Sequence, residues 1–153
     1  MDAAGVLRHQ LATLEYRTSK ALHGAPDGFG GFAAGEGVRT PVELLQHMTM
    51  LVRYSRTRLT STDGSSGEPV APGSIEEATA GLRAEIVALI RALEGGTLSD
   101  RAVKLLVQGP LSDALTHTGQ LALLRRLAGS PIPGESYVEA EIEADSLVAE
   151  GTG

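Results

Sequence analysis

The sequence contains no cysteine and no tryptophan, and aromatic residues make up only 3% of its 153 residues. Without cysteine the chain can form no disulfide and carries no thiol nucleophile of its own. With so few aromatic side chains, the core must consist mainly of Leu, Ala, Val and Ile. That composition favours packed helices over a sheet built from aromatic and β-branched residues. We therefore expect an all-α fold.

Long apolar runs and an excess of basic residues are also absent. No stretch approaches the roughly 20 apolar residues of a membrane span. Residues 1–20 carry charges throughout, unlike a signal peptide. The formal net charge is −6, whereas binding to a phosphate backbone requires a basic face. We expect a cytoplasmic protein that binds neither membranes nor nucleic acids.

Three segments show the periodicity and end signals of amphipathic helices. Residues 3–22 carry apolar side chains at three- and four-residue spacing. The stretch TPVE at 40–43 supplies an N-cap hydroxyl, a proline at the first position and an acid in the first turn. It predicts a helix that runs to about Leu59. The stretch SIEE at 74–77 is a capping box, which predicts a helix that runs to Leu93.

A fourth long helix is expected over residues 109–128. Gly109 and Pro110 provide its start, because proline suits the first helical position. Gly129 and the proline after it provide the stop. Residues 97–108, just before this helix, are ambiguous between a short helix or turn and a strand-like crossover, and we favour the helix or turn.

A polar row runs along this fourth helix. Asp113 and His117 are spaced so that they project from the same face, and Gln120 extends the row. Arg125 and Arg126 lie on the opposite side, and arginines on a helix surface usually face water. The row is therefore expected to face inward, where a carboxylate and an imidazole need a partner. A metal ion is one such partner.

The predicted connections are long. Residues 24–39 form a glycine-rich loop whose Phe29 and Phe32 are expected to anchor it to the helices. Residues 60–73 are a polar linker. Four amphipathic helices with two long connections predict a four-helix bundle over residues 1–134.

The remaining residues, 135–153, form an acidic tail without a cation. We expect its first part to pack on the bundle through Tyr137, Val138 and Ile142. Its end is expected to fray.

Two stretches resemble the DinB-like family, also called the damage-inducible or thiol-dependent metal-transferase family. The first is RTPVELLQH at 39–47, where the family has a helix that carries a metal-binding histidine. The second is DALTHTGQL at 113–121, followed by LRR at 124–126 and GSP at 129–131. The match spans most of residues 3–134.

The resemblance implies a bundle that holds a divalent metal through His47, Asp113 and His117, with zinc or nickel favoured over iron or manganese. Asp113 stands where the family usually has histidine, but two imidazoles and a carboxylate remain a known catalytic ligand set. Gln120 and Glu43, one turn from a ligand, would orient the ligands. In the alternative, Asp113 and His117 bond each other or Gln120 in a bundle that has lost its chemistry.

The resemblance also implies a function and an assembly. Several characterised members of the family use a small-molecule thiol for transfer or isomerisation, so we expect a metal-dependent thiol transferase with a small-molecule substrate. A non-catalytic dimeric bundle, acting in stress response or binding, is the alternative, and a metal-dependent hydrolase is a weaker one. The resemblance and the broad apolar surface of the fourth helix both favour a homodimer.

Overall fold

The computed structural model describes residues 1–60 and 73–151, so most of the predicted linker and the last two residues of the predicted tail lie outside the described residues. Every regular element in the described part is a helix, which confirms the all-α fold class. The elements are α1 (Ala3–Leu22), η1 (Phe29–Gly31), α2 (Pro41–Thr60), α3 (Ile75–Ala92), α4 (Asp100–Leu106), η2 (Val107–Leu111), α5 (Ser112–Leu127), η3 (Tyr137–Glu139) and α6 (Ala144–Glu150).

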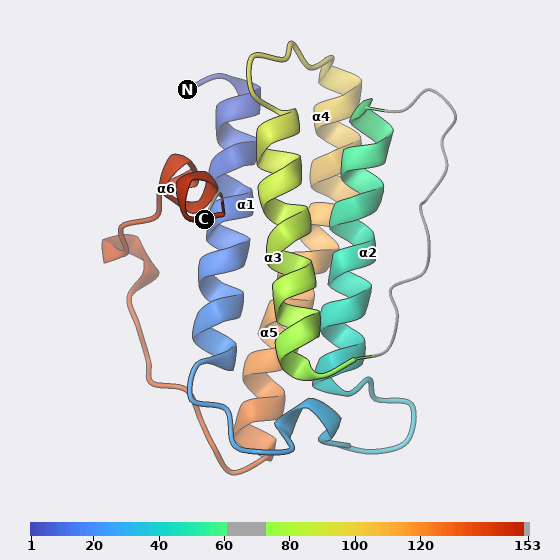
Figure 1. Cartoon of the computed structure of the whole chain (residues 1–153), viewed down its shortest axis with the longest axis vertical. Coiled ribbons are helices and arrows are strands. Elements are labelled where there is room, and N and C mark those ends of the chain that lie inside the picture. Colours follow the sequence, from blue (N-terminus) through green and yellow to red (C-terminus); the bar gives the residue numbers. More distant parts are fainter. Residues whose placement is uncertain (61–72, 152–153) are drawn as a thin grey trace.

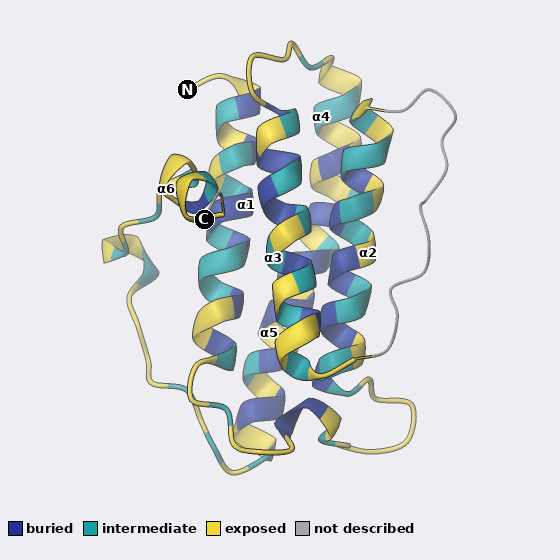
Figure 2. Cartoon of the chain, viewed as in Figure 1, coloured by how far each residue is buried: buried dark blue, intermediate teal, exposed yellow. Residues whose placement is uncertain are grey.

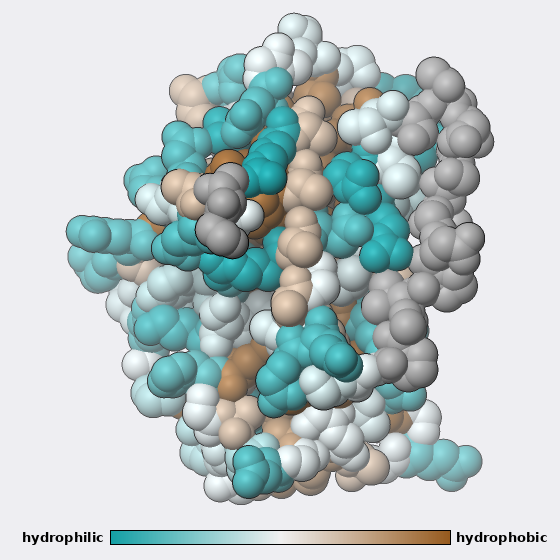
Figure 3. Space-filling view, viewed as in Figure 1, coloured by the Kyte–Doolittle hydropathy of each residue, from teal (hydrophilic) through white to brown (hydrophobic). Residues whose placement is uncertain are grey.

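The four long helices α1, α2, α3 and α5 run alongside one another, and α4 leads into α5 on the same path (Figure 1). α2 packs against α3 and α5, and α1 packs against the same two helices. Buried positions on each helix face its neighbours (Figure 2). Hydrophilic residues cover much of the visible face, with apolar residues between them (Figure 3). Among the described residues, no helix combines the length and apolar character needed to cross a bilayer.

The local helix signals are confirmed. At the start of α3, the Ser74 hydroxyl accepts from the Glu77 N–H, while the Glu77 carboxylate accepts from the Ser74 N–H. Thr40 and Glu43 form the same reciprocal pair before α2. The predicted apolar stripe of α1 is buried along its length: Leu7, Leu11, Leu14, Thr18 and Ala21. These stripes are the surfaces through which the long helices pack.

The predicted helix start at Gly109 and Pro110 is wrong. Both residues lie in η2, a π-helical turn that joins α4 to α5, and α5 begins at Ser112. Pro110 has no N–H, and its ring blocks the regular bond to the preceding turn. Gly109 accommodates the change with φ −106° and ψ −105°. The chain therefore kinks here without leaving the helical path, and the ambiguous segment before it contains the short helix α4.

The glycine-rich loop is anchored as expected, because Phe29 is buried and Phe32 packs against the core. The predicted tail is more ordered than expected and forms η3 and α6. Val138 is exposed, which contradicts its expected packing; Leu147 of α6 is buried instead. Hydrogen bonds from Tyr16 and Lys20 hold the pKa of Glu135, at the start of the tail, below its usual range. These contacts tie the tail to α1.

Arg125 contradicts the expectation that both arginines of the fourth helix face water. Its side chain is buried, with only 3% of the residue exposed, whereas Arg126 is exposed. The Arg125 guanidinium donates to backbone carbonyl oxygens at 2.9 to 3.2 Å, those of Ala21, His23, Gly24 and Ser130. The last carbonyls of a helix have no partner within it, and the guanidinium has five donors in a fixed fork. Arg125 thus joins the ends of α1 and α5.

We expect Arg125→Met to lower the free energy of unfolding by about 2 to 4 kcal/mol, because it leaves one buried and three part-buried carbonyls without this donor. The neighbouring change Arg126→Met is the control and should stay within about 0.5 kcal/mol of the wild type. Urea unfolding followed by circular dichroism measures both values. Equal stability of the two variants would contradict the role assigned to Arg125.

Candidate metal centre

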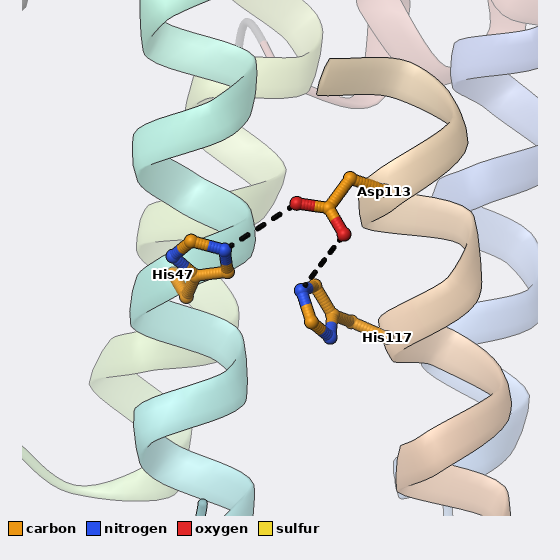
Figure 4. Close-up of side chains that lie close together, drawn as sticks. All are labelled: His47, Asp113 and His117. Carbon is orange, nitrogen blue, oxygen red and sulfur yellow. Dashed lines mark ion pairs between the residues drawn. The ribbon is translucent and has the colours of Figure 1, made fainter. Parts of the chain in front are cut away.

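The structure brings the three predicted ligands, His47, Asp113 and His117, together between two helices. Asp113 and His117 are one turn apart on α5, so the helix alone places their side chains on one face. His47 comes from α2, which packs against α5. Figure 4 shows Asp113 directed toward both imidazole rings. Of the polar row, His117 is buried and Asp113 is half-buried, whereas Gln120 is exposed, so the expectation that the row faces inward is wrong for Gln120.

The Asp113 carboxylate bridges the two histidines. Its Oδ1 lies 3.3 Å from His117 Nε2, and its Oδ2 lies 3.5 Å from His47 Nε2. The two rings are 4.9 Å apart between centroids and nearly perpendicular. One ligand atom from each residue can be chosen so that all three lie within 4.8 Å of one another. The arrangement converges on a single point between the helices.

His117 presents a lone pair to that point. Its Nδ1 lies 2.7 Å from the Gln120 Oε1, and an amide oxygen can only accept, so Nδ1 carries the proton. In the neutral ring Nε2 is then unprotonated. This nitrogen is buried and makes no hydrogen bond to the described residues, although the Asp113 Oδ1 lies 3.3 Å from it. A buried polar atom without a partner is costly, and a metal ion on Nε2 would remove that cost.

The spacing of the donor atoms suits a metal ion. Zinc bonds to nitrogen and oxygen are about 2.0 to 2.2 Å long, so two ligands of a tetrahedral ion lie about 3.4 Å apart. The two observed separations, 3.3 and 3.5 Å, are close to that distance but run to different oxygens of Asp113, and one donor atom from each residue gives a set within 4.8 Å. Neutral imidazoles with one carboxylate suit zinc, nickel, iron and manganese alike. The residues present therefore fit a divalent first-row ion without identifying which one.

Exposure changes across the cluster. The side chain of His117 is 8% exposed, that of His47 is 29% exposed and that of Asp113 is 46% exposed. The centre is therefore closed on the His117 side and open on the Asp113 side. A small molecule would approach past Asp113.

A cavity of about 560 Å³ opens on that side, and we call it the metal-side cavity. Its lining comes from α2, η2 and α5: Leu51, Tyr54, Gln108, Gly109, Pro110, Ser112, Asp113 and Thr116. Tyr54 is not among the predicted site residues, although it lies two turns after His47 on the same helix. Gln108 could not be identified, because its place depends on the unexpected turn η2.

The two predicted supporting residues have different positions. Gln120 meets His117, as described above. Glu43 is engaged one turn before His47, where its carboxylate accepts from the N–H and hydroxyl of Thr40. The backbone hydrogen bond, reinforced by the hydroxyl, holds the pKa of Glu43 below its usual range. Glu43 thus serves the start of α2.

We expect Gln120→Leu to weaken zinc binding about 10- to 100-fold, because His117 loses the acceptor that fixes its ring and tautomer. Gln120→Glu keeps an acceptor at the same distance along the side chain. Its zinc affinity should therefore exceed that of Gln120→Leu by at least the same factor. Competition with a chromophoric chelator measures both affinities. Wild-type affinity in Gln120→Leu would show that the contact does not orient the ring.

Comparison with known proteins gives no further guide to this centre. No family model, no curated protein and no solved structure matches the chain. The resemblance to the DinB-like family therefore rests on the residue motifs alone.

Proposed function

We propose that this protein is a metal-dependent enzyme whose divalent ion is held by His47, Asp113 and His117. The observation that carries the proposal is the buried Nε2 of His117, which makes no hydrogen bond to the described residues and lies 3.3 Å from the Asp113 carboxylate, beside a second imidazole. Three protein ligands leave at least one coordination position for a substrate or water, as in catalytic zinc sites. The metal-side cavity lies at the open edge of the cluster, beside Asp113.

A bound ion would lower the pKa of a thiol or water in the open position. The residues of the chain would do the rest. Gln120 holds the His117 ring in one orientation through Nδ1. The Asp113 carboxylate, lying between the rings, offsets the charge of the ion. The walls of the metal-side cavity position the reactants, and the packed helices exclude water behind His117.

We further propose that the nucleophile is a low-molecular-weight thiol, as the resemblance to the DinB-like family suggests. The chain has no cysteine, so any sulfur nucleophile comes from a cosubstrate. In such a transfer the thiol loses its proton to solvent and its sulfur forms a bond to an electrophilic carbon. The leaving group departs with the electron pair of the bond that breaks.

Hydrolysis is a second candidate because Asp113 is open to solvent, so water reaches the same position. A non-catalytic dimeric bundle that acts in stress response or binding is a third. It is favoured by Leu123 and Leu127, which are 52% and 58% exposed on α5. The two enzymatic candidates use the same ligands and differ in the second reactant.

We expect protein purified without an affinity tag to contain about one equivalent of divalent metal. His117→Ala and His47→Ala should each lower metal affinity at least about 100-fold. Removing a direct ligand costs more affinity than removing a residue that only orients a ligand. His9→Ala, which changes an exposed histidine on α1, is the control and should bind like the wild type. Elemental analysis and circular dichroism measure loading and folding.

Turnover is then assayed on the loaded protein, with small thiols plus an aromatic halide for transfer and with nitrophenyl esters for hydrolysis. No metal in the wild type, even after addition of zinc, nickel, manganese or iron, would overturn the enzyme proposal. Full loading without turnover in either assay would favour the non-catalytic candidate.

We also expect a homodimer through the exposed apolar part of α5. The double change Leu123→Glu and Leu127→Glu should convert it to a monomer, because four carboxylates cannot be buried at such an interface without partners. Light scattering after size exclusion measures the mass. A wild-type monomer, or a variant that remains dimeric, would contradict this interface.

A further inference from the structure

A second cavity, of about 530 Å³, lies beside the metal-side cavity between α2, α4 and η2. We call it the arginine cavity, because Arg58 of α2 and Arg101 of α4 both line it. Tyr54, Gln108, Gly109 and Pro110 line both cavities. The two spaces are therefore adjoining parts of one groove that leads from Asp113 to the two arginines.

The two arginines differ from their neighbours. Arg53 and Arg56, earlier on α2, hold Glu85 between them at 2.8 and 3.0 Å. Arg58 and Arg101 make no hydrogen bond or ion pair with any residue that the structure describes. Two unpaired guanidinium groups on one cavity create a local positive potential in a chain whose net charge is −6. Guanidinium groups in such a setting are suited to bind an anion.

The rest of the arginine cavity is largely apolar. Leu105 and Tyr54 line the cavity and are exposed to solvent. Leu106 and Pro110 also line it and are buried. The volume, 530 Å³, is typical of a small-molecule site, which combines apolar walls with a few polar anchors. Guanidinium groups bind carboxylate and phosphate oxygens through paired hydrogen bonds.

We propose that the arginine cavity binds the anionic end of a small organic acid through Arg58 and Arg101. Its apolar part lies against Tyr54 and Leu105, and its other end reaches the metal-side cavity. The Asp113 carboxylate repels an anion and so fixes this orientation. Anion binding stands on the arginines alone, whereas the placement of the reactive end rests on the proposed function.

The test is an NMR titration of protein stripped of metal with a chelator, so that no probe binds through an ion. The probes are 3-phenylpropionate, 2-phenylethyl phosphate and the neutral 3-phenylpropan-1-ol. Both anions should shift the amide signals of Leu105 and Gly109 and bind at least about tenfold more tightly than the alcohol, as expected for charge-assisted hydrogen bonds. A preference between the two anions identifies carboxylate or phosphate as the group selected.

The variant is the double change Arg58→Gln and Arg101→Gln, and the control is Arg126→Gln on α5, outside the cavity. All three arginines are exposed, so circular dichroism should show unchanged folding. The double variant should lose at least about tenfold in affinity for the anions and none for the alcohol. Equal binding of anions and alcohol, wild-type affinity in the double variant, or no binding of either anion would each overturn the proposal.

His117→Ala separates this proposal from the proposed function. Anion binding that persists in a variant without metal affinity supports the arginine cavity whatever the fate of the enzyme proposal. If the wild type does not bind metal and does not turn over substrate, but still binds the anions through the two arginines, only the proposed function is overturned.

Discussion

The packing of α2 against α5 is the constraint on which the candidate centre depends. An α-helix places Asp113 beside His117 without help, but a metal ion needs a third ligand from elsewhere. That ligand, His47, arrives because the apolar face of α2 is buried in the same core as that of α5. The free energy that holds the three ligands together thus comes largely from apolar burial between α2 and α5. The ligands themselves are polar groups at the edge of that contact.

The buried imidazole of His117 forms the closed side of the centre. Gln120 fixes the proton on Nδ1, and the opposite nitrogen makes no hydrogen bond among the described residues, as is also true of the buried Nε atoms of Arg8 and Arg17. Proteins seldom keep such an atom without a reason, because an unpaired buried acceptor costs free energy that hydrogen bonding elsewhere does not return. The open, Asp113 side of the cluster then decides where a reactant would enter.

The π-helical turn at Gly109 and Pro110 gives the groove its shape. A regular helix from α4 into α5 would leave no wide turn between them, whereas Pro110 removes one backbone hydrogen bond and kinks the path. Wide turns of this kind often occur at functional sites. Here the turn lies between the metal-side cavity and the arginine cavity, and it supplies walls to both.

The sequence by itself determined what depends on contacts within one or two helical turns: the all-α class, the caps at Thr40 and Ser74, and the pairing of Asp113 with His117. These follow because helix geometry sets the distance between residues close in the chain. The resemblance suggested His47, but only the tertiary structure decided that it lies beside Asp113 and His117, that Arg125 is buried and that Arg58 and Arg101 share a cavity. Periodicity places Arg125 on a side of its helix, but only the carbonyls at the end of α1 make burial of its charge favourable.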